Sequence, residues 1–85
     1  MVLNLVHMVP INELTAAAVR DAKEAAGATI ESLSDDTGIP PSTLKRRLNG
    51  QVSFGLDQIV LIAIALDVPF EQLIPTSDAL TRSAA

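Results

Sequence analysis

Residues 27–50 read GATIESLSDDTGIPPSTLKRRLNG, a pattern typical of two short helices separated by a tight turn. Thr29 supplies the side-chain oxygen that an N-cap needs. Leu33, one turn further on, gives the following segment an apolar face, and Gly38 is suited to end it. We therefore expect the first helix of the pair over residues 30–37.

The second helix of the pair follows a proline-rich turn. Pro41 suits the first position of a helix, where no backbone N–H donor is needed, and Asn49-Gly50 is typical of a C-terminal stop. Leu44 and Leu48 are one helical turn apart and predict a buried edge. We expect this helix over residues 41–48, with its two leucines in the core.

Three further helices flank this pair, so the sequence predicts an all-α fold of five short helices. We expect them over residues 11–26, 56–66 and 69–74, in each case next to a proline or glycine. The first carries small and apolar residues at steps of three and four: Ile11, Leu14, Ala18, Ala22 and Ala25. In the last, three residues are expected to face inward: Phe70, Leu73 and Ile74.

The helix expected over residues 56–66 is apolar nearly all round, so it must be central or shared with a partner. Its core face can be supplied by Leu56, Ile59, Val60, Ala63 and Leu66. Leu61 and Ile64 then remain as surplus apolar surface on one face, which we expect a second copy of the chain to cover. The alternative cover is the apolar N-terminal arm, through Val2, Leu3, Leu5 and Val6.

The composition of the 85 residues excludes several kinds of site. There is no cysteine, hence no disulfide or thiolate nucleophile, and the single histidine, His7, rules out a multi-histidine metal centre. We expect no metal, no other cofactor, no small-molecule ligand and no enzymatic activity. The longest apolar run, residues 59–66, is too short to span a bilayer, so we expect a cytoplasmic protein without a membrane partner.

Positive charge is concentrated in one place. The formal net charge is −4, yet three of the six basic residues are consecutive, at Lys45-Arg46-Arg47, and no acid lies between Asp36 and Asp57. Salt screens each charge beyond about 10 Å, so the local charge matters more than the sum. This stretch coincides with the second helix of the pair, where we therefore look for function.

Two short helices joined by a tight turn form the helix-turn-helix, whose second helix lies in the major groove of DNA. If the two leucines of residues 41–48 point inward, five residues share the outward side: Pro41, Ser42, Lys45, Arg46 and Asn49. Lysine and arginine can reach the O6 and N7 acceptors of guanine, and serine and asparagine can bond to base edges or phosphates. The pattern indicates a DNA-reading helix.

These motifs also resemble the lambda-repressor/Cro-like (Xre-type) helix-turn-helix family, in a form similar to members from actinobacteria and their phages. The resemblance covers roughly residues 14–74 and depends on TGI, STL, NG, IAIALDVP and EQLI at the family's usual spacings. It implies that Pro41, Ser42, Lys45 and Arg46 face base edges, that Asn49 contacts phosphate and that Thr43 lies near the backbone. Ile30, Arg47 and Leu48 depart from the family pattern, which leaves Arg47 as either a DNA contact or a packed stem.

We therefore expect an apolar arm over residues 1–10, a DNA-binding domain over 11–74 and a flexible tail over 75–85. The predicted function is a phage- or prophage-type transcriptional regulator that binds a two-fold-related operator as a homodimer. Its predicted DNA contacts are Pro41, Ser42, Thr43, Lys45, Arg46, Arg47, Asn49 and Gln51. The alternative is a protein-interaction module, such as an antitoxin or an inhibitor of a host protein, that uses the Leu61/Ile64 face.

Overall fold

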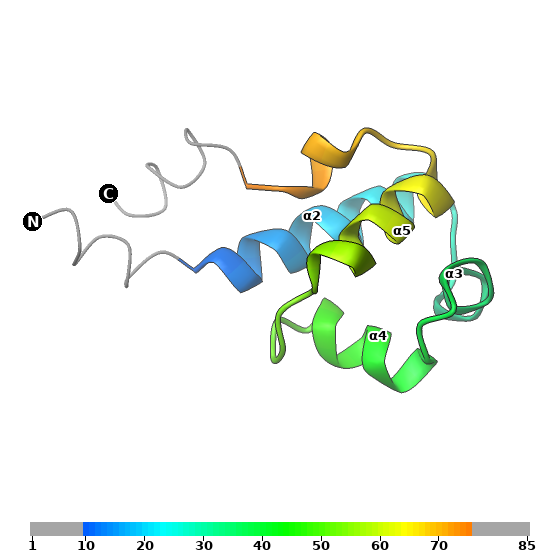
Figure 1. Ribbon diagram of the computed structural model, residues 1–85, viewed down its shortest axis with the longest axis horizontal. Helices are drawn as coiled ribbons and strands as arrows, with labels where there is room; N and C mark the ends of the chain where they lie inside the picture. Colours follow the sequence, from blue (N-terminus) through cyan, green and yellow to red (C-terminus); the bar gives the residue numbers. More distant parts are fainter. Residues whose placement is uncertain (1–9, 76–85) are drawn as a thin grey trace, which may run out of the picture.

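The computed structural model describes residues 10–75, and there it confirms the all-α fold. Four α-helices are followed by a single 3-10 turn: α2 (Ile11–Ala25), α3 (Ile30–Thr37), α4 (Pro41–Leu48), α5 (Leu56–Leu66) and η1 (Phe70–Leu73). Figure 1 shows α4 at one edge of the bundle and η1 at the opposite edge. Apart from Pro10 and Pro75, the arm and tail predicted at the two ends lie outside the described residues. None of the helices within 10–75 combines the length and apolarity needed to cross a membrane.

The start of α3 is fixed by the cap that the sequence predicts. The Thr29 side chain accepts a hydrogen bond from the Ser32 backbone N–H, and the Ser32 side chain accepts one from the Thr29 N–H, both at 3.0 Å. This reciprocal pair satisfies two N–H groups that a helix start otherwise leaves without partners.

Replacing Thr29 by alanine is expected to lower the free energy of unfolding by about 1 kcal/mol, because the Ser32 backbone N–H loses the side-chain oxygen that caps it. Urea denaturation followed by circular dichroism measures the change. Ser53→Ala, which removes a hydroxyl from an exposed loop residue, is the control. Equal losses in the two variants would show that the cap does not stabilise α3.

The turn between α3 and α4 sets the angle between the two helices. Gly38 has a φ of 78°, a left-handed conformation that glycine adopts without strain, and its N–H donates to the Ser34 carbonyl at 2.8 Å. The Thr37 hydroxyl donates to the Leu33 carbonyl at 2.7 Å and accepts from the Ile39 N–H at 3.2 Å. Side-chain and backbone bonds therefore hold this short connection.

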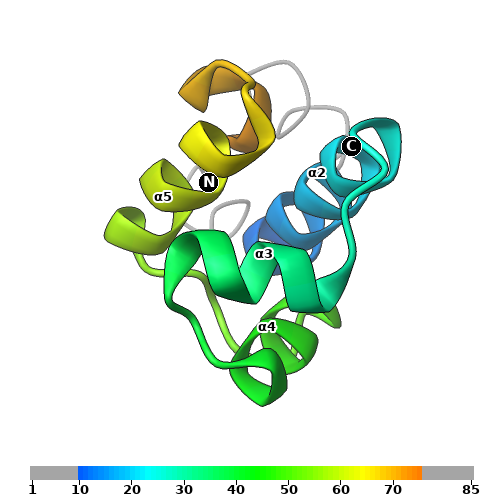
Figure 2. The same ribbon diagram turned by 90° about the vertical axis from the view of Figure 1, so that its right-hand side faces the viewer.

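One hydrophobic core joins all the elements, and α3 packs against both α4 and α5 while α2 contacts α4, α5 and η1. Figure 2 shows α3 lying across the ends of α2 and α5, with α4 below it. The largest fully buried side chains come one from each element: Val19, Leu33, Leu44, Ile62 and Leu73. Leu44 and Leu48 thus belong to the core, which confirms the predicted buried edge of α4.

The predicted faces of the two longest helices are partly wrong. In α5, Leu56 and Val60 are exposed rather than buried, and Ile62 is fully buried in their place. A helix that is apolar all round has no periodic signal to indicate which side faces the core. In α2, Ala22 is the one residue of the predicted stripe that is buried, and the other buried residues of the helix are Thr15, Ala16 and Val19.

The last predicted helix, over residues 69–74, is only the single 3-10 turn Phe70–Leu73. The four residues between Pro69 and Ile74 allow one turn, which is the usual length of a 3-10 helix. Leu73 is fully buried as expected, whereas Phe70 and Ile74 are half-buried against the core.

Candidate nucleic-acid interface

Helix α4 lies at the lower edge of the molecule in both views, with one side in the core and the other in solvent (Figures 1 and 2). Leu44 and Leu48 are 0% and 5% exposed, and they hold the helix against α2 and α3. The opposite side consists of residues that the structure leaves exposed: Pro41, Ser42, Lys45, Arg46 and Asn49. The structure therefore brings these five predicted site residues together on one accessible face.

The other three predicted contacts differ in their surroundings. Gln51 is exposed, whereas Thr43 and Arg47 are half-buried along one flank of α4. The Nε atom of Arg47 is buried and has no hydrogen-bond partner among residues 10–75. Of the two interpretations of Arg47, the structure favours the packed stem for the side chain as far as its Nε atom.

Backbone hydrogen bonds fix the end of α4. The N–H groups of Asn49, Gly50 and Gln51 donate to carbonyls of the last helical turn at 3.1, 3.1 and 3.2 Å. Gly50 makes this possible with a φ of 77°. The positions of Asn49 and Gln51 are therefore rigidly coupled to the helix that precedes them.

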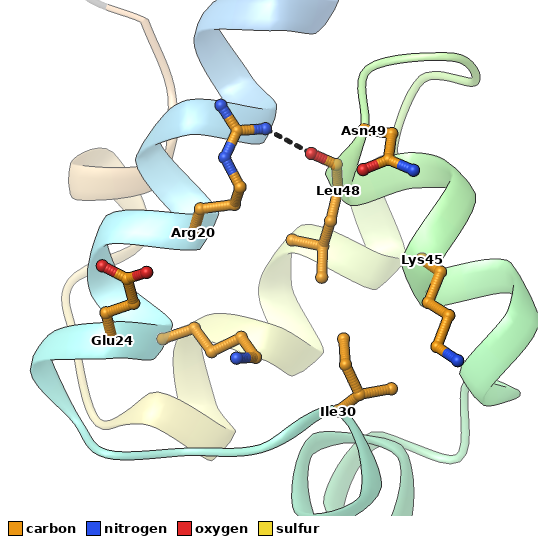
Figure 3. A pocket seen from close by; sticks show the side chains of 7 residues that line it. Arg20, Glu24, Ile30, Lys45, Leu48 and Asn49 are labelled. Carbon is orange, nitrogen blue, oxygen red and sulfur yellow. Dashed lines mark hydrogen bonds between the residues drawn. The ribbon is translucent and has the colours of Figure 1, made fainter.

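Arg20 of α2 adds a contact that the sequence does not reveal. Its Nη1 donates to the Leu48 carbonyl, across 28 positions of the chain (Figure 3). The last carbonyls of a helix lack partners within the helix, so this bond ties the C-terminal end of α4 to α2. No spacing rule connects two residues so far apart.

Beside this contact lies a hollow of about 390 Å³ between α2, α4 and the start of α3 (Figure 3). We call it the basic hollow, and it is lined by Arg20, Lys23, Glu24, Ile30, Lys45, Leu48 and Asn49. Its lining includes two residues of the exposed face of α4, Lys45 and Asn49. The other two cationic residues, Arg20 and Lys23, come from α2, a helix in which the sequence shows no site motif.

A family model described as helix-turn-helix matches residues 19–73, more than half of the chain. The chain belongs to the helix-turn-helix family. More closely, it belongs to the lambda-repressor-like (Xre-type) group of this family, whose members are DNA-binding regulators. Comparisons with curated proteins and with solved structures gave no match.

In this helix-turn-helix protein, α3 and α4 are the two helices of the motif, and α4 is the second. The cationic residues Lys45 and Arg46 therefore lie on the second helix of the motif, at one edge of the fold (Figure 1). Among residues 10–75, no group of three or more His, Asp or Glu side chains is close enough to hold a metal ion.

The second predicted surface of the helix-turn-helix protein is on α5. Leu61 and Ile64 are 41% and 72% exposed, so no part of the described chain covers them fully. Leu56 and Val60, which the sequence placed in the core, extend this exposed surface by one helical turn. The apolar face of α5 thus comprises Leu56, Val60, Leu61 and Ile64.

Proposed function

We propose that this helix-turn-helix protein is a cytoplasmic regulator of transcription that recognises a specific sequence in double-stranded DNA by placing α4 in the major groove. The observation that carries the proposal is the orientation of α4. Its two leucines are buried, and its exposed side carries Lys45 and Arg46 at the edge of the fold. A helix must project from the surface of its domain in this way to reach base edges in the groove.

The proposed roles follow from donor chemistry. Lys45 and Arg46 bind guanine O6 and N7, and Ser42 bonds to the edge of a neighbouring base pair. Pro41 offers only an apolar contact near the start of α4, where Thr43 lies close to the DNA backbone. Three residues at the end of the helix anchor phosphates: Arg47, Asn49 and Gln51.

The negative net charge of the protein does not oppose this mode of binding. Within α4 the charged residues are Lys45, Arg46 and Arg47, with no acid in the helix. At ordinary salt an acid more than about 10 Å away is largely screened from a phosphate that contacts α4. The attraction between α4 and the DNA phosphates is therefore local. A single copy of the domain makes few phosphate contacts and is expected to bind DNA weakly.

We further propose that two copies bind together through the apolar face of α5. In Figure 2, α5 forms one side of the molecule and α4 its lower edge, so a two-fold axis that runs vertically in this view beside α5 leaves both copies of α4 at the lower edge of the dimer. Two such helices reach successive major grooves when the half-sites are about 34–36 Å apart. The family resemblance supports a phage- or prophage-type repressor that blocks access of the polymerase.

Arg46→Ala is expected to weaken operator binding by about 1–3 kcal/mol and to relax the preference at one base pair, because one bidentate contact is lost. The operator is first selected from a random pool of duplexes, and affinities are then measured by fluorescence anisotropy. Gln72→Glu on η1, which changes the net charge by the same amount far from α4, is the control. Unchanged affinity and sequence preference in Arg46→Ala would contradict the assignment.

The second candidate function is a protein-interaction module that uses the apolar face of α5. The exposure of Leu61 and Ile64 and the net charge of −4 favour it. A gel shift on mixed-sequence DNA over a range of salt separates the two functions. Retardation at low salt that weakens as salt rises supports the DNA-binding regulator, and no retardation at low salt supports the protein partner.

A further inference from the structure

A depression separate from the basic hollow lies at the end of the bundle where α2 and α5 begin. It has a volume of about 230 Å³, and residues from the starts of both helices, from the loop before α5 and from the segment after η1 line it. We call it the terminal groove. Figure 1 shows that α2 begins and the described chain ends on the same side of the molecule, at the left of the view. The terminal groove therefore lies where residues 1–9 join the fold.

The lining of the terminal groove is mainly apolar. Ile59 is buried and Phe54 and Ile74 are half-buried, whereas Ile11 is 46% exposed. None of the described residues that line the groove is charged, and two are polar: Asn12 and Thr15. A contiguous apolar depression of this kind indicates a place where another apolar segment binds.

The chain itself supplies a segment of matching chemistry. Residues 1–9 contain no Asp, Glu, Lys or Arg, and seven of the nine are apolar: Met1, Val2, Leu3, Leu5, Val6, Met8 and Val9. They join the fold at Pro10, and the next residue, Ile11, lines the groove. A segment attached so close to its site has an effective concentration on the order of millimolar there, so weak contacts are enough to hold it.

The residues that follow the described chain match the terminal groove less well. Residues 76–85 also join the fold beside it, because Pro75 is one of its lining residues. They carry two charged residues, Asp78 and Arg82, and Leu80 is their one large apolar residue. Burial of a charge without a partner costs free energy, so the apolar groove favours residues 1–9.

A second copy of the chain is expected elsewhere on α5. Leu56 lines the terminal groove, but it is 68% exposed and belongs to the apolar face of α5 that we propose as the dimer surface. Ile64, the most exposed residue of that face, lies about 12 Å from Leu56 along the helix axis. A dimer centred on Leu61 and Ile64 therefore leaves Ile11 accessible to another segment.

We propose that residues 1–9 bind in the terminal groove of their own chain and place apolar side chains against Phe54, Ile59 and Ile74. The segment then covers Ile11 and extends the core at the end of the bundle where α2 and α5 begin. The proposal depends neither on DNA binding nor on the dimer, because every contact lies within one copy.

Phe54 makes a direct test possible. It is one of two phenylalanines in a chain without tyrosine or tryptophan, so its ring protons are readily assigned. In the isotope-labelled full chain, nuclear Overhauser effects are expected between this ring and methyl groups of residues 1–9. The same effects are expected in Ile64→Asp, which lacks the proposed dimer contact. Their absence, or effects from Leu80 in their place, would overturn the inference.

A sample that mixes labelled and unlabelled chains distinguishes contacts within one copy from contacts between two. An isotope filter then records only the effects that join a labelled chain to an unlabelled one. No effect between the Phe54 ring and residues 1–9 is expected in this spectrum. If such an effect appeared there, residues 1–9 of a second copy would occupy the groove, and docking within one chain would be wrong.

The contribution of the segment to stability is tested with serine substitutions in the full chain. The double variant Leu3→Ser/Leu5→Ser is expected to lower the folding equilibrium constant about tenfold, because apolar side chains no longer fill the groove. Urea denaturation measures the constant. Leu80→Ser, which makes the same replacement within residues 76–85, is expected to leave it unchanged. Equal constants in the two variants would contradict the docked segment.

Discussion

Leu44→Ala is expected to lower the free energy of unfolding by about 2–5 kcal/mol, a large share of the stability of so small a domain. Leu44 is fully buried and belongs to the core cluster that α2, α3 and α5 complete. Its truncation leaves a cavity directly beneath the exposed face of α4. Because Leu44 holds this face in place from the core side, DNA affinity is expected to fall together with the free energy of unfolding.

Urea denaturation measures the loss in Leu44→Ala, and Leu56→Ala is the matched control. Both variants remove the same atoms, but Leu56 is 68% exposed in the single chain, so the control is expected to lose less than about 1 kcal/mol when unfolding is measured at a concentration at which the chain is a monomer. If both variants lost the same amount, the inner leucine of α4 would not be the anchor that the structure indicates.

Ile64→Asp is expected to separate the proposed dimer, since a charge placed on the apolar face of α5 cannot be buried against a second copy without a large cost. Ile64 is 72% exposed, so the fold of the single chain is expected to survive. When the two copies on neighbouring half-sites no longer bind each other, the affinity for the full operator falls by about 10²–10⁴-fold. Binding to a single half-site is expected to remain unchanged.

Sedimentation velocity gives the association state of Ile64→Asp, and anisotropy with one-site and two-site duplexes gives the two affinities. Gln72→Glu again serves as the control for added negative charge. A wild-type chain that sediments as a monomer at high concentration, or an Ile64→Asp variant that keeps its full-operator affinity, would exclude the apolar face of α5 as the dimer surface.

Local signals made the helix-turn-helix pair predictable. Thr29, Gly38 and Pro41 each mark a helix boundary by a conformational preference that does not depend on distant residues, and the structure places all three boundaries as predicted. Leu44 and Leu48 were also identified correctly, since α4 has polar residues on its remaining sides and therefore a clear apolar edge. The exposed face of α4 follows directly from that edge.

The errors lie where local signals are absent. Helix α5 is apolar nearly all round, so the choice between Val60 and Ile62 for the core depends on where α2 and α3 lie. The bond from Arg20 to the Leu48 carbonyl depends on how α2 packs against α4. The basic hollow is a product of the same packing, which is why Lys23 could not be recognised as part of a site from its neighbours in sequence.

Chemical-shift mapping tests the central claim most directly, namely that the exposed face of α4 is the surface that meets DNA. Isotope-labelled full-length protein is titrated with a mixed-sequence duplex at low salt, and backbone amide shifts are followed for every assigned residue. We predict that the largest shifts fall between Ser42 and Gln51 and that η1 is unaffected. An unchanged spectrum, or shifts centred on Leu61 and Ile64 with α4 unperturbed, would contradict the account.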